Sequence, residues 1–323
     1  MTKSYAAKRR DFTAGASRPF ASHVAWAVVC ALLIATAMAL WIQAQSLASQ
    51  NASLKKQLAA TAVPRAEPVT CRAGAAWQPG ATTVHSVAGR QYLVHTPADF
   101  DNEKYYPLLL FYPGKGATPQ MIQNAYGLDA LPVIVAYPYP TTSTDGFPSW
   151  QGAPYSSGSD DVAFTQAVID KTQDDLCIDR TKMYAAGMSN GGGFVSLLSC
   201  RMADQLAGFV VIAGAMYAPH DDCVPSRATP LLSVHGDKDA SVPYAGSAIR
   251  RLPAIESWSA KRAQLNGCSA RETSSQGLAL EITTWSGCRD GAVVQSVRVV
   301  GGIHAWGDVT NDTIWNFLSR FSL

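Results

Sequence analysis

The feature that most constrains the fold of this chain is a serine between two glycines, placed between an apolar strand and a helix. Residues 187–191 read Gly-Met-Ser-Asn-Gly, with KMYAA before them and FVSLLSCRMA after them. A sharp strand-to-helix turn brings backbone segments so close that side chains two positions either side of the serine would clash. The turn lifts the Ser189 hydroxyl clear of the sheet, beside the N–H groups that begin the helix. Glycine-rich turns are common, but this context predicts a nucleophilic serine.

Strand and helix patterns alternate from Cys71 onward, as in a mostly parallel sheet covered by helices on both faces. The expected strands are continuously apolar, which is typical of strands buried on both faces. They cover residues 91–95, 108–112, 132–137, 182–186, 209–213, 230–235 and 293–300. Helices are expected over residues 161–176, 251–265 and 311–321. The sequence therefore predicts a single α/β domain over residues 71–323.

A serine hydroxyl needs a base to act as a nucleophile, and the base needs a carboxylate to orient it. After a turn of this kind, the expected chain order is serine, acid, histidine. The segment PLLSVHGDKDASVPY presents a strand and then a loop with Asp237 and Asp239, and VRVVGGIHAWGD presents a strand and then His304. Both loops follow strands, at the edge where α/β sheets place their sites. His235 precedes the acid and is interpreted as structural, and an ordinary surface role is the alternative for His304.

Three segments, DDVAFTQAVIDKTQDDLCIDRTKMYAAGMSNGGG, HGDKDASVPY and GGIHAWG, resemble the polyhydroxybutyrate depolymerase and feruloyl esterase family of secreted α/β-hydrolases. The resemblance spans most of residues 80–310. It implies an α/β-hydrolase fold in which Ser189 is the nucleophile, His304 the general base and then acid, and Asp239 the orienting carboxylate. Asp239 is preferred over Asp237 because it matches the family pattern HG-x-x-D-x-x-VP. The implied reaction is ester hydrolysis without a cofactor, on a polyester, a feruloylated or acetylated polysaccharide, or a lipid.

One departure from the family concerns the loop that should stabilise the oxyanion. The family usually has His-Gly after this strand, whereas this chain has Pro113-Gly114. Proline has no N–H to donate, so the backbone N–H groups of Lys115 and Asn190 are the expected donors. Aromatic side chains near these segments are candidates for a substrate pocket, with core or rim packing as the alternative. The pocket candidates are Tyr112, Trp150, Tyr155 and Trp306.

Two other functions remain open at this stage. An envelope acyltransferase would use the same three residues to pass the acyl group to a sugar or lipid hydroxyl. A non-catalytic envelope binding protein would keep the fold alone, and Pro113 makes this alternative worth testing. Nucleic acid is not expected as a partner, because 26 Lys and Arg against 24 Asp and Glu give a net charge of only +2.

The N-terminal region predicts a membrane anchor. Residues 24–42 carry no charge over 19 positions, about one bilayer crossing for a helix. Basic residues precede this run, so the N-terminus should stay in the cytoplasm and the rest of the chain should lie outside. The predicted divisions are a basic tail (1–22), a transmembrane signal-anchor (23–42), a stalk or linker (43–70) and the α/β domain. A cleaved signal peptide, ending near Ser46-Leu47-Ala48, is the alternative, and it would give a secreted protein.

The cysteines fit an oxidising compartment. Cys30 lies in the apolar run and should stay unpaired, while the other six form an even set. Cys268 with Cys288 is the expected pair, because the two flank one predicted strand. No Cys-x-x-Cys pair occurs, and the adjacent residues 220–222 (His-Asp-Asp) are interpreted as a turn, so no metal site is expected. The candidates for disulfide bonds are Cys71, Cys177, Cys200, Cys223, Cys268 and Cys288.

Overall fold

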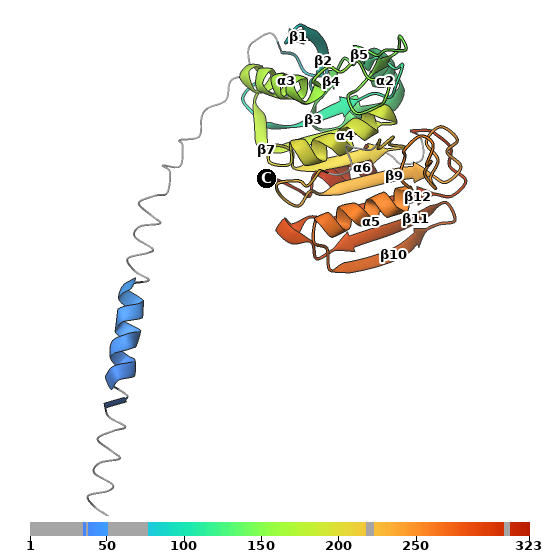
Figure 1. Ribbon diagram of the computed structural model, residues 1–323. Helices are drawn as coiled ribbons and strands as arrows, with labels where there is room; N and C mark the ends of the chain where they lie inside the picture. Colours follow the sequence, from blue (N-terminus) through green and yellow to red (C-terminus); the bar gives the residue numbers. More distant parts are fainter. Residues whose placement is uncertain (1–34, 37, 51–76, 218–222, 307–310) are drawn as a thin grey trace, which may run out of the picture. The chain divides into compact units, whose positions relative to one another are not determined.

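The chain divides into two units, Met1–Val69 and Thr70–Leu323. In the first unit, residues 35–36 and 38–50 are helical. Within the described part of the chain, no helix is both long and apolar enough to cross a membrane. The predicted cytoplasmic tail and most of the predicted span fall outside the described part. The computed structural model describes residues 35–36, 38–50, 77–217, 223–306 and 311–323 (Figure 1).

The second unit is built on a sheet that has ten strands among the described residues. The six central strands of this sheet run parallel. Two antiparallel strands extend the sheet at each of its two edges. A separate short hairpin joins β5 (Thr141–Thr142) to β6 (Pro148–Ser149). The strand order is β1 (Thr82–Val87), β2 (Arg90–His95), β4 (Ile134–Pro138), β3 (Tyr106–Tyr112), β7 (Ile178–Met188), β8 (Gly208–Ile212), β9 (Leu231–Gly236), β12 (Val294–Val299), β11 (Leu280–Ser286) and β10 (Ala270–Gln276).

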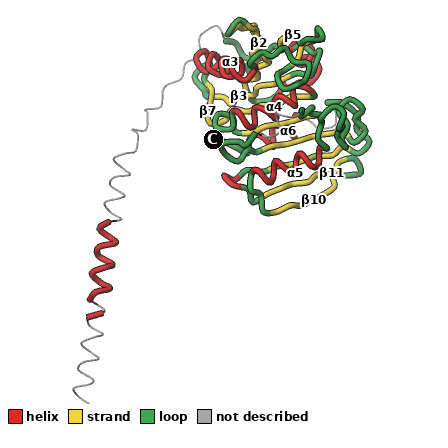
Figure 2. The backbone as a smooth tube through the Cα atoms, in the orientation of Figure 1, coloured by secondary structure: helices red, strands yellow, loops and turns green. Residues whose placement is uncertain are grey.

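Helices cover both faces of the sheet, as Figures 1 and 2 show. Along β3, Leu108 and Leu110 join one buried apolar cluster while Leu109 and Phe111 join another, because successive side chains of a strand point to opposite faces. This three-layer arrangement confirms the predicted α/β-hydrolase fold. The first cluster packs on α3 (Asp161–Asp175), α4 (Asn190–Arg201) and α5 (Ile255–Leu265), and the second on α2 (Pro119–Tyr126) and α6 (Asn311–Leu318).

Each strand expected from an apolar run is present, but two helix boundaries differ from the prediction. The helix expected from residue 251 begins at Ile255, because Ser247 and Leu252 exchange two backbone hydrogen bonds of 2.9 Å and hold the preceding segment in a turn. The last helix ends at Leu318, so Phe321 lies beyond it. The apolar patterns missed the helix α2 and the strand β1, and they predicted one strand between Cys268 and Cys288 where the structure has two, β10 and β11.

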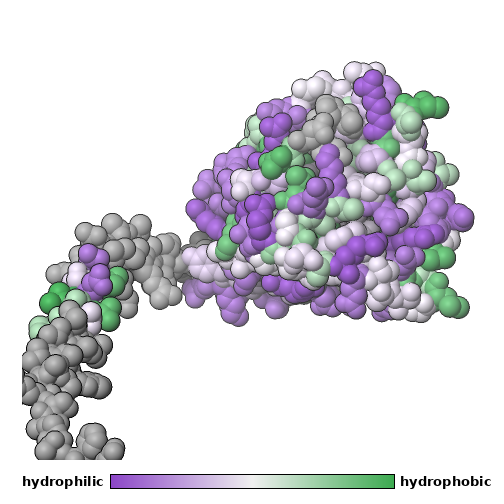
Figure 3. Space-filling model, turned by 60° about the horizontal axis from the view of Figure 1, so that its bottom comes forward, coloured by the Kyte–Doolittle hydropathy of each residue, from purple (hydrophilic) through white to green (hydrophobic). Residues whose placement is uncertain are grey.

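One face of the second unit, drawn in Figure 3, is largely hydrophilic. On the face drawn in Figure 3, hydrophilic residues surround small, separate groups of hydrophobic ones. At one edge of the sheet, β10 is exposed at all of its positions and has the polar sequence ARETSSQ. Arg271 of this strand lies 3.4 Å from Glu256 and over the ring of Trp285. A strand with so little buried surface has no apolar pattern, which explains why it was not predicted.

The expected disulfide between Cys268 and Cys288 is present. It closes the β10–β11 hairpin, so the two cysteines flank two strands instead of the one that was predicted. A second disulfide joins Cys200 at the end of α4 to Cys223. Cys177 is also disulfide-bonded. Residues 30 and 71, the remaining cysteines, fall outside the described part of the chain.

Candidate active site

Ser189 lies in the turn between β7 and α4, where its backbone has φ 56° and ψ −121°. Residues with side chains rarely adopt this region, and such strain is typical of functional turns. A methyl group on Gly191 would lie 2.6 Å from the carbonyl carbon of Tyr112, and one on Gly187 would lie 2.6 Å from the carbonyl oxygen of Gly191. Both glycines are therefore needed for the close backbone approach, for the reason expected from the motif.

His304 and Asp239 meet at the same edge of the sheet. Asp239 follows β9 and His304 follows β12, and both strands run parallel to β7, so their loops lie at the edge where Ser189 sits. His304 Nδ1 is 2.7 Å from Asp239 Oδ2. Among the described residues, no hydrogen bond joins Ser189 to His304 or occupies His304 Nε2. That nitrogen is the one a catalytic histidine directs to its serine.

The carboxylate of Asp239 is buried and accepts several N–H donors. Its Oδ1 accepts from the amides of Ser241 and Val242 at 2.8 and 2.7 Å. Its Oδ2 accepts from His304 and lies 3.2 Å from Nε2 of His235. Burial by itself would raise the pKa of Asp239, but the hydrogen bonds from His235, Val242 and His304 outweigh burial and lower the pKa to about 2. The group is therefore ionised at neutral pH.

Asp237, the other carboxylate of this loop, has different partners. Its Oδ2 lies 2.9 Å from Arg298, and its Oδ1 accepts from the amide of Gly301 at 2.8 Å. These contacts join the loop after β9 to the loop that carries His304. Of the two aspartates on the loop, Asp239 alone contacts His304, and Asp237 is engaged in holding the two loops together.

The loop after β3 passes beside Ser189. A methyl group on Gly114 would lie 3.2 Å from the Cβ atom of Ser189. In the described part of the chain, no hydrogen bond uses the backbone N–H of Lys115. Asn190 is the first residue of α4, so its N–H has no acceptor within the helix. Among the described residues, neither of the two N–H groups expected to bind the oxyanion has a hydrogen-bond acceptor.

Trp150 contacts both the loop after β3 and the start of α4. Its backbone N–H donates to Asn190 Oδ1 at 2.7 Å, and its indole Nε1 donates to the carbonyl oxygen of Pro113 at 2.9 Å. Its ring stacks on Phe194 with centroids 5.4 Å apart. Trp150 therefore holds Pro113 and Asn190, the neighbours of the serine on two different elements, in a fixed relation.

A partly buried ion pair extends this support. Arg90 of β2 lies 2.6 Å from Asp161 Oδ1 at the start of α3, and Asp161 Oδ2 accepts from the amide of Gln151 at 2.6 Å. Burial raises the pKa of Asp161 in spite of the opposing charge of Arg90. The guanidinium also lies 3.7 Å from the ring centroid of Phe164. Sequence reasoning missed this network because Arg90 and Asp161 are far apart in the chain and belong to no motif.

The four aromatic pocket candidates fall into two groups. Tyr112 and Trp150 are 0% exposed, so they have no surface with which to contact a substrate, and they are part of the core that supports the site. Tyr155 and Trp306 are half-buried. Trp306 stacks on Tyr126 with centroids 4.3 Å apart and an interplanar angle of 1°. Of the four, only Tyr155 and Trp306 keep exposed surface.

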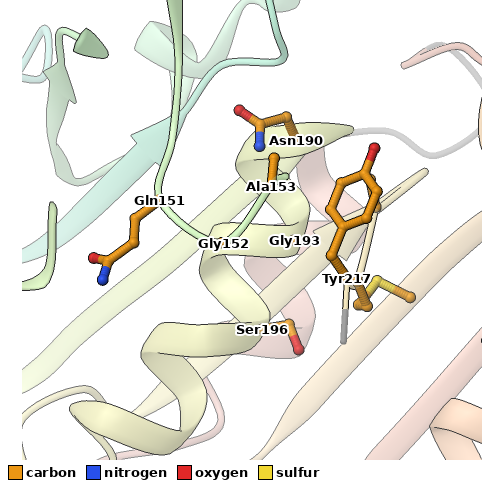
Figure 4. A pocket seen from close by; sticks show the side chains of 9 residues that line it. Gln151, Gly152, Ala153, Asn190, Gly193, Ser196 and Tyr217 are labelled. Atoms are coloured by element: carbon orange, nitrogen blue, oxygen red, sulfur yellow. The ribbon is translucent and has the colours of Figure 1, made fainter. Parts of the chain in front are cut away.

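A small pocket lies beside the first turn of α4 (Figure 4). The loop 151–153 forms one side of it, and Tyr217 lies opposite. Among the described residues, no group of three or more His, Cys, Asp or Glu side chains is placed to hold a metal ion. The segment 220–222, interpreted as a turn, falls outside the described part of the chain. The lining residues are Gln151, Gly152, Ala153, Asn190, Gly193, Ser196, Ala215, Met216 and Tyr217.

Known proteins are similar to this chain in sequence, and solved structures are similar to it in fold. Feruloyl esterase B of Piromyces equi is 30% identical over 249 residues, which cover 72% of this chain and 46% of that protein. Feruloyl esterase C of Emericella nidulans is 28% identical over 184 residues, which cover 54% of this chain and 64% of that protein. This chain is therefore similar in sequence to feruloyl esterases. No protein-family model matches it.

Solved structures of low sequence identity support the α/β-hydrolase fold. An acetyl xylan esterase from Aspergillus awamori superimposes with a TM-score of 0.57 at 14% identity, over 74% of this chain and 99% of that one. A mutant feruloyl esterase module from Clostridium thermocellum, complexed with sinapinate, gives a TM-score of 0.50 at 16% identity over 78% of this chain and 94% of that one. The chain spans about half the length of the first curated relatives it matches, 46% and 57%.

Proposed function

We propose that this chain is an extracytoplasmic serine carboxylesterase in which Ser189, His304 and Asp239 form a catalytic triad. The observation that carries the proposal is the 2.7 Å hydrogen bond between His304 Nδ1 and Asp239 Oδ2, at the sheet edge that also holds the strained turn of Ser189. An ionised carboxylate behind Nδ1 fixes the tautomer in which Nε2 is free to accept a proton. His304 can then act as the general base for the serine.

The reaction would proceed in two steps. Ser189 Oγ attacks the ester carbonyl while His304 Nε2 takes its proton, and the N–H groups of Lys115 and Asn190 stabilise the negative oxygen of the tetrahedral intermediate. His304 returns the proton to the leaving alcohol as the acyl-enzyme forms. Water, activated by the same nitrogen, then attacks the acyl-enzyme and frees the acid. No cofactor takes part in this scheme.

The substrate class proposed is a feruloyl or acetyl ester on a polysaccharide. Support comes from the names of the relatives, which are feruloyl esterases, and from the fold shared with an acetyl xylan esterase. Polyester and lipid esters are the other classes to include in a test.

We also propose that residues 23–42 anchor the chain, with residues 1–22 inside the cell, 43–70 as a stalk and 71–323 as the catalytic domain. The disulfides of the second unit favour a location outside the cytoplasm. If residues 23–42 are removed by a signal peptidase, the same domain is secreted.

The test uses the purified full chain with methyl ferulate, p-nitrophenyl acetate, an acetylated xylan, a polyester and a lipid ester as substrates. Ser189→Ala should lower kcat at least about 10³-fold, because the nucleophile is lost. Ser274→Ala on the exposed strand β10 is the matched control and should keep the wild-type rate. A fluorophosphonate probe should label the wild type at Ser189. Hydrolysis that persists unchanged in Ser189→Ala, or a wild type that the probe does not label, contradicts the proposal.

A further inference from the structure

A second histidine contacts the acid of the proposed triad. His235 lies near the end of β9, and its side chain is 1% exposed. Its Nε2 is 2.8 Å from the carbonyl oxygen of Val242 and 3.2 Å from Asp239 Oδ2. The ring of Tyr244 packs against it at a centroid distance of 6.0 Å. The proposed mechanism gives His235 no role.

The partners of His235 determine where its proton lies. The carbonyl of Val242 and the ionised carboxylate of Asp239 can only accept hydrogen bonds, so Nε2 must be the donor. Nδ1 is buried and has no hydrogen-bond partner among the described residues. His235 therefore donates from Nε2, and this one N–H group faces both oxygens.

The oxygen that His235 contacts is the one that faces His304. Two backbone amides, of Ser241 and Val242, hold Oδ1 of Asp239. Among the residues that the structure describes, His304 would be the only donor left to Oδ2 without His235. The same Nε2–H reaches the carbonyl of Val242, so the loop that carries Asp239 is tied back to the strand it leaves.

We propose that His235 is a positioning residue of this active site. By donating to Asp239 Oδ2 and to Val242, it fixes the rotation of the carboxylate and so aligns Oδ2 with His304 Nδ1. It does not touch the substrate, and it acts on the reaction only through Asp239. This inference rests on the proposed function, because it assigns His235 a task within that triad.

Three substitutions of His235 test the proposal in the full chain. His235→Leu removes the donor, so kcat should fall about 10- to 100-fold, as expected for the loss of one hydrogen bond to a charged group. KM should stay within about twofold, since no substrate contact is lost. His235→Gln places an N–H near the position of Nε2 and should recover most of kcat. His235→Asn places its N–H near Nδ1, where no acceptor lies among the described residues, and should not recover kcat.

The control is His85→Leu on β1, which lies outside the site and should keep the wild-type kcat. A side chain that only fills space gives a different pattern: the Gln and Asn variants have equal rates, or the thermal stability falls while kcat is unchanged. Either pattern overturns the proposal. If the Leu variant does not fold, the comparison of Gln with Asn still decides the question.

Ser189→Ala, measured in parallel, separates this inference from the proposed function. If Ser189→Ala keeps the wild-type rate, the serine esterase proposal fails and takes the role of His235 with it. If Ser189→Ala is inactive while the Leu and Asn variants of His235 keep the wild-type kcat, only the role of His235 is wrong.

Discussion

Replacing Asp239 with asparagine tests the electrostatic basis of the site. The carboxylate has the amides of Ser241 and Val242 on Oδ1, and His304 and His235 on Oδ2. An asparagine offers one oxygen and one NH₂ group, so in either orientation two of these donors face another donor. With NH₂ towards His304, the imidazole must adopt the tautomer that blocks Nε2. We expect kcat to fall about 10³- to 10⁴-fold.

The same substitution should lower stability, by an amount that follows from the pKa of Asp239. The lowering of the pKa from 3.8 to about 2 corresponds to about 2 kcal/mol of the free energy of unfolding at neutral pH. Because the folded pKa is lowered, this contribution is present above pH 3.8 and is lost as the pH falls towards 2. The difference in stability between wild type and Asp239→Asn should therefore shrink below about pH 4.

The assay combines initial rates on p-nitrophenyl acetate with urea unfolding at pH 7 and at pH 3. Asp237→Asn is the matched control, because it lies two residues away on the same loop and contacts Arg298 and Gly301 instead of His304. This control should keep kcat within a few-fold of wild type. If Asp239→Asn keeps more than about a tenth of the wild-type kcat, or if both variants lose activity equally, the assignment of the catalytic acid is wrong.

Two further substitutions probe the framework around the site. Gly191→Ala should give little folded protein, because its methyl group would lie 2.6 Å from the carbonyl carbon of Tyr112. The control Gly277→Ala, at an open hairpin position, should lower the free energy of unfolding in urea by only about 1 kcal/mol. Equal losses of stability in the two variants would refute the steric argument. Replacing both Cys268 and Cys288 with alanine opens a loop of 20 residues. This change should lower the free energy of unfolding by about 3 kcal/mol and leave kcat unchanged. A large loss of kcat in folded protein would contradict this expectation and show that the hairpin supports the site.

The sequence predicted the parallel part of the sheet well, and the physical reason is burial. Strands such as β3 and β8 are covered on both faces, so nearly every side chain is apolar, and an apolar run of this kind has few alternative interpretations. The edge strands β1 and β10 are exposed along one or both faces and have no such run. Patterns of hydrophobicity carry information about an element only to the extent that the element is buried.

The candidate site shows a similar division. The turn of Ser189 and the loops of Asp239 and His304 could be recognised because close backbone approach and catalytic chemistry restrict the residue types at short spacing. The supporting roles of Trp150 and of the second histidine, His235, could not be predicted from the sequence. Each of these residues acts through partners distant in the sequence or through a backbone carbonyl. For His235 a signal did exist, since it stands directly before the glycine of the acid loop, but its contact with Asp239 became evident only from the geometry.

The polar strand β10 also bears on how the molecule behaves at high concentration. The last strand of a sheet presents free N–H and C=O groups on which another chain can build. A second molecule that paired with β10 would have to accommodate Arg271 and Glu272, which stand next to each other in this strand. The charged pair thus discourages the growth of an intermolecular sheet and favours dispersed molecules at high protein concentration.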